Sequence, residues 1–334
     1  MHWFDPFGST KLKDMCSTPA INNLKNDAVR YLFWDQEPLY KSALEQVLPI
    51  FSTTYDGTLH LITSEKDSAT ADWAAKTYNC NIHYYFFHGW AALDWYRGYN
   101  RSFQITPFNQ RQIKKTFIAP NRIIAGERRH RLEMLYYIFK HGLADNHVSC
   151  PSVCPAEGIS VHDAILPLKS KYPNIEEVFK NQSLPINFKG ETDHPMHSCW
   201  LSLFDESAES LLYLVTETVA TGQRLHLTEK TFKPIAMGMP FIIVGTQGSL
   251  RYLRSYGFRT FGDLWDESYD DEPDDSKRIE KIAQVLELLD GLGEYQQAIF
   301  DSAQEIIKHN WNHFYNGEFE EVLWAELKTM LDKF

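Results

Sequence analysis

The chain has 334 residues, which at about 150 residues per domain predicts two domains rather than one. Hydrophobic residues make up 43% and aromatic residues 14% of it, so the composition excludes a disordered chain. The formal net charge of −11 at pH 7 weighs against a protein whose bulk charge binds nucleic acid or a membrane surface.

Three apolar runs in the first part of the chain predict strands, at residues 28–34, 58–64 and 81–87. Each run ends at a polar or glycine-containing cluster, as buried parallel strands do when their carboxyl ends carry functional loops. Polar stretches compatible with helices separate the three runs. We therefore expect an α/β domain over residues 1–112.

A second α/β domain is expected over residues 113–300, and a helical segment over 301–334. Alternating strands and helices of this length form a parallel sheet covered on both faces. Two such domains leave a crevice toward which the strand ends point. Strands are expected at 116–120, 211–217, 240–245 and 258–262. Helices are expected at 128–142, 228–238, 247–256 and 276–291, and near 293–309 and 317–333.

A basic segment at residues 111–131 holds seven arginines and lysines against one acid. Arg122 lies in a turn after a predicted strand, and the next helix begins near Arg128. Guanidinium groups beside a helix N-terminus match the oxygens of a diphosphate, which makes this turn a candidate binding site. The alternative, basic residues that coat a solvated helix face, applies more to Arg129 and Lys114.

The segment between residues 212 and 245 is the most informative part of the sequence. A predicted strand ends at Glu217, and Thr228 suits the N-cap of the next helix. Glu229 is able to accept hydrogen bonds from a ribose diol, and Lys230 to neutralise a phosphate. Gly245 follows the next strand, where a missing side chain lets a ligand approach the backbone. The alternative is an ordinary capped helix with an exposed Glu–Lys pair.

This segment resembles the donor-binding signature of the α-1,3-fucosyltransferase family. In that family a strand ending in Glu-Asn precedes a Tyr-Val-Thr-Glu-Lys helix start and then an Ala-Gly-x-Pro-Val-x-x-Gly strand. Residues 216–218 (Thr-Glu-Thr), 227–230 (Leu-Thr-Glu-Lys) and 237–245 (from Met-Gly-Met-Pro to Gly) occupy that order here. The basic residues 122–131 resemble the family's arginine-bearing turn and helix. The similarity covers about residues 116–255 at the level of fold and motif.

The resemblance implies a GT-B-like fold of two facing Rossmann-like domains, with the acceptor side in residues 1–112 and the donor side in residues 113–300. It also implies a glycosyltransferase that moves a sugar from a nucleotide diphosphate sugar, the donor substrate, to an acceptor hydroxyl, with no further cofactor. In the family, residues matching Glu229 bind the nucleotide ribose, and those matching Lys230 and either Arg122 or Arg128 bind the diphosphate. We assign Glu217, Thr228 and Gly245 to the same donor site. Thr218 replaces the family's asparagine, and Pro234 lies inside the predicted helix, so the donor sugar stays open.

An inverting glycosyltransferase needs a general base for the acceptor hydroxyl and stabilisation for the departing diphosphate. We expect Glu37, ahead of Asp35, to act as the base, because both follow a predicted strand of the first domain. The alternative is that Asp35 only caps the turn before Pro38. His88 and Asp94 are second choices. The sequence shows no obvious set of metal ligands, so we expect no metal site and assign the leaving-group charge to arginine, lysine and a helix N-terminus.

Other signals carry less weight. Eight acids between Asp263 and Asp275 favour a solvated, flexible loop over a metal site. The motifs of dinucleotide oxidoreductases, P-loop NTPases and α/β hydrolases do not occur. A non-catalytic nucleotide- or glycan-binding protein remains the main alternative, and an epimerase or phosphorylase of the same fold a further one. The acceptor stays open among a glycan, a lipid-linked sugar, a protein and a modified nucleobase.

The cellular location is expected to be cytoplasmic. No run approaches the roughly 18 apolar residues that span a bilayer, and no basic stretch precedes an apolar run near the start. The five cysteines are scattered, as is typical of reduced thiols in an intracellular protein.

Overall fold

The computed structural model describes residues 2–4, 30–34, 38–54, 58–189 and 200–333. Asp35 and Glu37, the predicted general bases, lie outside these ranges. The chain divides into two compact units. The first comprises Met1–Ala91, Gly222–His226 and Glu320–Phe334; the second comprises Ala92–Thr221 and Leu227–Phe319. Residues 92–112, which we had expected in the first domain, thus belong to the second unit.

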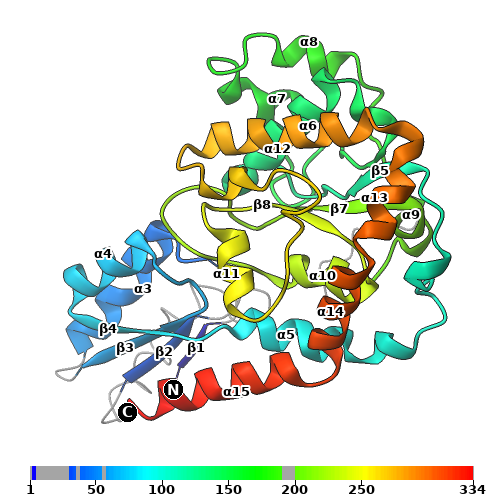
Figure 1. The fold of residues 1–334 in the computed structure, drawn as a ribbon. Helices are drawn as coiled ribbons and strands as arrows, with labels where there is room; N and C mark the ends of the chain where they lie inside the picture. The colour runs from blue at the N-terminus through cyan, green and yellow to red at the C-terminus, as the bar shows by residue number, and fades with distance from the viewer. Residues whose placement is uncertain (1, 5–29, 35–37, 55–57, 190–199, 334) are drawn as a thin grey trace. The chain divides into compact units, whose positions relative to one another are not determined.

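The first unit contains a parallel four-stranded sheet in the order β1-β2-β3-β4. The strands are β1 (His2–Phe4), β2 (Arg30–Trp34), β3 (Leu59–Thr63) and β4 (Cys80–Tyr84). The helices α3 (Lys41–Thr54) and α4 (Ala69–Tyr78) connect successive strands and lie on one face of the sheet (Figure 1). The three strands predicted in this part of the chain are confirmed, with ends shifted by a few residues.

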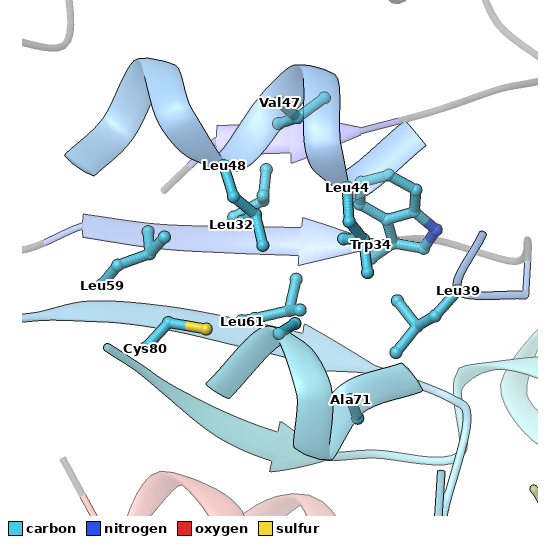
Figure 2. Close-up of a cluster of buried hydrophobic side chains, with 11 residues drawn as sticks. Leu32, Trp34, Leu39, Leu44, Val47, Leu48, Leu59, Leu61, Ala71 and Cys80 are labelled. Carbon is cyan, nitrogen blue, oxygen red and sulfur yellow. The ribbon is translucent and has the colours of Figure 1, made fainter. Parts of the chain in front are cut away.

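The core of the first unit follows from the alternation of side chains along its strands. Leu32 and Trp34 of β2 lie on the same face as Leu61 of β3, and Leu44 and Leu48 of α3 pack against them (Figure 2). All five side chains are less than 2% exposed. Successive residues of a strand point to opposite faces, so the residues between them form a second apolar surface.

The second surface of this sheet is covered by α5 (Phe87–Tyr96) and the C-terminal helix α15 (Glu318–Leu331). Met330 of α15 packs with Phe33 and Ile62 of the strands. The Glu326 carboxylate accepts a hydrogen bond of 2.7 Å from the backbone N–H of Phe86, just before α5. The last helix of the chain is therefore part of the first unit's core.

The second unit contains a parallel four-stranded sheet in the order β6-β5-β7-β8. Its strands are β5 (Lys115–Ala119), β6 (His147–Val148), β7 (Ser210–Thr216) and β8 (Phe241–Val244). Helices α6 and α12 lie on one face and α10 on the other (Figure 1). The helices are α6 (His130–Lys140), α7 (Val161–Ile165), α8 (Ile175–Lys180), α9 (Phe204–Glu209), α10 (Glu229–Met237), α11 (Ser249–Ser255), α12 (Asp275–Asp290), α13 (Gln296–Ser302) and α14 (Gln304–Tyr315).

The predicted α/β class is confirmed, since both sheets are parallel and flanked by helices. Three of the four strands predicted for the second domain are confirmed as β5, β7 and β8. The helices expected at 128–142, 228–238, 247–256 and 276–291 are confirmed as α6, α10, α11 and α12. The helix expected at 293–309 is instead two helices, α13 and α14, separated at Ala303.

The strand predicted at 258–262 is wrong. Side chains, not a neighbouring strand, hold this backbone. The Asn310 side chain accepts a hydrogen bond from the N–H of Arg259 (2.8 Å) and donates one to its carbonyl (2.9 Å). The Glu267 carboxylate accepts another from the N–H of Phe261 (2.7 Å).

The acidic stretch at 263–275 is solvated only in part: Asp263, Asp266, Asp271 and Asp274 are exposed as expected, whereas Glu267 and Asp270 bind neighbouring backbone. Asp270 is 4% exposed and accepts hydrogen bonds from the N–H groups of Leu250 (2.8 Å) and Arg251 (3.0 Å) at the start of α11. Glu267 accepts further bonds, including one from the Thr260 hydroxyl (2.7 Å). Both acids thus hold backbone in place. Asp270 in particular accepts from N–H groups at the start of α11 that have no partner within the helix.

Replacement of Phe232 in α10 is expected to have a large effect on folding stability. The ring is fully buried and contacts the rings of Phe258, Phe314 and Phe319 at centroid distances of 5.7, 5.9 and 5.2 Å. Phe232→Ala is expected to lower the free energy of unfolding by about 3–5 kcal/mol, because it leaves a cavity. Urea denaturation measures the loss. Leu288→Ala, at a side chain that is 72% exposed, is the control and should change stability by less than about 0.5 kcal/mol. Equal losses would contradict the packing.

Candidate site at the carboxyl edge of the second sheet

The carboxyl ends of β5 and β7 lie side by side in the second sheet, and the chain leaves each through a polar loop. The Thr216 hydroxyl at the end of β7 donates a hydrogen bond to the side-chain carbonyl of Asn121 (3.1 Å), just past β5. Ligands of open parallel sheets bind at this edge, since the loops there converge. The predicted donor-binding residues of the turn 120–129 and of α10 follow these strand ends.

Glu217, directly after β7, fixes the start of α10. Its side chain is buried with 0% exposure. One carboxylate oxygen accepts hydrogen bonds from the N–H of Thr228 (3.1 Å) and the hydroxyl of Thr231 (2.6 Å), and the other accepts one from the Thr228 hydroxyl. We predicted that Glu217 faces the donor, but both of its oxygens are engaged by α10. Its role in the structure is to position the helix N-terminus.

Thr228, Glu229 and Lys230 form the start of α10. Thr228 is the N-cap, and its hydroxyl oxygen accepts a hydrogen bond from the N–H of Lys230. Lys230 Nζ lies 2.8 Å from a carboxylate oxygen of Glu229 and 3.2 Å from the Thr218 hydroxyl. The side chain of Glu229 is 7% exposed and that of Lys230 is 29% exposed. The pair is therefore sheltered, unlike the exposed Glu–Lys pair of an ordinary surface helix.

Two arginines of the basic segment are buried and bind backbone. Arg131 donates to the carbonyl oxygens of Ile123 (2.9 Å) and Thr216 (3.0 Å), so it ties the turn after β5 to the end of β7. Arg111 donates to the carbonyl of Gly238 (3.0 Å) and to that of Met237, which ends α10. Burial lowers the pKa of each to about 10. Neither role was predicted.

Arg122 and Arg128, the predicted diphosphate ligands, lie half-buried in the turn that Arg131 holds. Burial lowers the pKa of Arg131 most, and the charge of Arg128 lowers it further, whereas the charges of Glu217 and Glu229 raise it. The charges of Arg128, Glu217 and Glu229 therefore all act on the guanidinium of Arg131. Arg128 and the first residue of α10 thus both lie near this group.

Gly245 is required by packing against protein atoms. A Cβ there would lie 2.6 Å from Oγ of Ser249 and 3.2 Å from Cγ2 of Ile243. Its carbonyl accepts a hydrogen bond of 2.9 Å from Nε of Arg278, which is 2% exposed. Arg278 also donates to the carbonyl of Ala220 (2.7 Å), so it joins the loops after β7 and β8. Sequence reasoning had interpreted Gly245 as an opening for a ligand and missed Arg278.

His88 and Asp94, the second choices for base catalysis, belong to different units, His88 to the first and Asp94 to the second. His88, in the first unit, is 2% exposed and its ring centroid lies 5.0 Å from that of His226. Asp94 is exposed and pairs with Arg97 at 2.6 Å. The described part of the chain contains no cluster of three or more His, Cys, Asp or Glu side chains that could hold a metal ion.

Comparison with known proteins adds no relative. No family model matches the chain, and no curated protein or solved structure matches it. Within the ranges that the structure describes, none of the helices is long and apolar enough to cross a membrane.

His130, at the start of α6, makes stability depend on pH. Its ring Nε2 lies 2.9 Å from the carbonyl of Glu217, and burial lowers its pKa from 6.5 to about 3. Unfolded histidine binds a proton near pH 6.5 and the folded residue does not, so stability falls as pH drops below 6.5. At pH 5 the loss is about 2 kcal/mol, at 1.36 kcal/mol per pH unit.

Urea denaturation at pH 7.5 and pH 5 checks this prediction in the wild type and in His130→Gln, which keeps a hydrogen-bond donor. The variant should lose about 2 kcal/mol less between the two pH values than the wild type does. Identical pH dependence in both proteins would contradict a neutral, buried His130.

Proposed function

We propose that the chain is a GT-B-like glycosyltransferase whose donor, a nucleotide diphosphate sugar, binds at the start of α10. The observation that carries the proposal is the sheltered pair of Glu229 and Lys230 at a helix N-terminus on the carboxyl edge of a parallel sheet. A helix N-terminus favours anions, and a half-buried lysine there is worth more to a phosphate than an exposed one. Glu229 supplies acceptor oxygens for the hydroxyl groups of a ribose.

The proposed reaction is an inverting transfer to an acceptor hydroxyl. Lys230 and Arg128, with Arg122 as the further predicted ligand, stabilise the charge that develops on the departing diphosphate. This assignment calls for no metal ion. The general base must take the proton of the acceptor hydroxyl, and Glu37, ahead of Asp35, stays our prediction for it.

Calorimetric and thermal-shift titrations with UDP, GDP, CDP, dTDP and their sugars test the proposal, each with and without divalent metal. One nucleoside diphosphate should bind selectively, and its sugar should be converted to the free diphosphate when an acceptor panel is added. Binding without turnover, unchanged in Glu37→Gln, would favour a non-catalytic nucleotide-binding protein. Failure of all four nucleotides to bind would overturn the donor site itself.

A further inference from the structure

Five residues between Glu217 and Thr228 belong to the first unit although the chain on both sides belongs to the second. We call this segment, Gly222–His226, the strap. Leu225 and Lys66 exchange backbone hydrogen bonds of 2.7 and 2.9 Å in an antiparallel bridge just past β3. The carbonyl of Gln223 accepts a further bond of 3.1 Å from the N–H of Ala69. The strap is thus paired by its backbone to the segment that follows β3 at the carboxyl end of that strand.

Arg224, at the centre of the strap, binds a fully buried acid. Its guanidinium lies 3.1 Å from a carboxylate oxygen of Glu65, whose side chain is 0% exposed. The same oxygen of Glu65 accepts a hydrogen bond of 2.9 Å from the N–H of Leu39, and Arg224 donates one of 3.4 Å to the carbonyl of Leu39. Ser68 also binds Glu65. The pair therefore holds both polar backbone groups of Leu39.

Because Glu65 is buried, its carboxylate depends on the positive charge of Arg224. Burial raises the pKa of Glu65, and the charge of Arg224 acts in the opposite direction. A buried carboxylate that loses its partner costs several kcal/mol, since it has given up water without a substitute. The strap therefore has a structural role beyond linking β7 to α10: it supplies the guanidinium that pairs with Glu65.

The ends of the same loop are fixed at the candidate donor site. Glu217 binds both polar groups of Thr228, and Lys230 contacts the hydroxyl of Thr218. Only Leu227, itself fully buried, lies between the end of the strap at His226 and the N-cap Thr228. A restraint placed on the start of α10 therefore reaches the strap through one residue of chain.

We infer that the strap couples nucleotide binding at the start of α10 to the carboxyl edge of the first unit's sheet, with Arg224 as its positioning residue. The inference rests on the proposed function, since a nucleoside diphosphate is the ligand that restrains Thr228 and Lys230. Coupling between two sites is reciprocal, so binding the nucleotide secures the strap, and a secured strap strengthens nucleotide binding.

Amide hydrogen exchange followed by NMR tests the coupling in the full chain. The reporters are the N–H groups of Leu39, Lys66, Ala69 and Leu225, each of which is engaged in strap docking. Their exchange is measured alone and with saturating UDP, GDP, CDP or dTDP. The nucleotide that binds should slow all four by about fivefold or more, the lower range of known couplings.

The double variant Glu65→Gln/Arg224→Met removes the ion pair without leaving a buried charge. It should abolish the slowing and weaken nucleotide binding by about fivefold, with the N–H of Phe117 in β5 exchanging as in the wild type. Glu267→Gln/Arg254→Met is the control, because it removes a second arginine–glutamate pair (3.4 Å), whose acid is only 10% exposed, at a place outside the strap. It should retain both the slowing and the affinity.

The outcomes separate the coupling from the function. A nucleotide that binds while the four amides exchange unchanged overturns the coupling and leaves the proposed function standing. A double variant that keeps the slowing also overturns it. If none of the four nucleotides binds, the proposed function fails and the coupling falls with it. The wild-type comparison decides alone if the double variant does not fold.

Discussion

Lys230→Ala is expected to weaken nucleoside diphosphate binding by about 1.5–3 kcal/mol, a rise in Kd of roughly 10- to 150-fold. The reason is the position of its ammonium group at the start of α10, where the side chain is only 29% exposed. A charge-assisted bond to a phosphate in such a sheltered place is screened little by solvent. Isothermal titration calorimetry of both proteins measures the difference.

Lys277→Ala is the matched control for this prediction. Lys277 also lies in the first turn of a helix, α12, but its side chain is exposed and its helix is capped by Asp274. Its removal should leave Kd unchanged. An affinity that is the same in Lys230→Ala and in the wild type would remove Lys230 from the site.

Glu217→Ala is expected to lower the free energy of unfolding by about 3–5 kcal/mol and to abolish nucleotide binding. The buried carboxylate accepts three hydrogen bonds from Thr228 and Thr231 at the start of α10, and a hydrogen bond to a charged group contributes about 1.5–3 kcal/mol. Without it, Thr228 and Thr231 lose their acceptor and the start of α10 is no longer held against β7. Urea denaturation and calorimetry measure the two effects.

Glu209→Ala serves as the control, because Glu209 lies at the opposite end of β7 and pairs with the exposed Lys114. An exposed pair contributes at most about 1 kcal/mol. Glu217→Gln should fall between the two, since it keeps one carbonyl oxygen. If Glu217→Ala cost no more than Glu209→Ala, Glu217 would not be the anchor of α10.

The strands that could be predicted are those with long buried runs. The strand β7 is buried along its whole length, and residues 211–215 form an unbroken apolar run that marks it in the sequence. The strands β1 and β6 have three and two residues, too few to form a pattern. The segment 258–262 is apolar enough to suggest a strand, but its backbone partner Asn310 is 51 residues away in the chain.

The residues of the candidate site also fall into two groups, those that a local sequence pattern marks and those whose partners are distant in the chain. Thr228, Glu229 and Lys230 could be found because a helix N-terminus is a local pattern. The supporting arginines could not be placed, because their carbonyl partners are distant: 127 residues separate Arg111 from Gly238. One signal was present for Arg278, which continues the apolar stripe of α12 and is buried with it. An arginine on such a stripe predicts a buried guanidinium with backbone acceptors.

The strap was beyond sequence reasoning for another reason. Its polar residues predict a solvated loop, and the burial of Glu65 that requires Arg224 is a property of the folded first unit. The sequence shows that Arg224 carries a charge, but it does not identify Glu65, 159 positions away, as the partner of that charge.

A crystal structure of the protein with the nucleoside diphosphate that binds most tightly would show whether α10 holds the donor. We expect a diphosphate within hydrogen-bond distance of Lys230 Nζ at the start of α10, and a ribose whose hydroxyl groups donate to the carboxylate of Glu229. A nucleotide bound elsewhere, with the start of α10 unoccupied, would contradict a donor site at this helix.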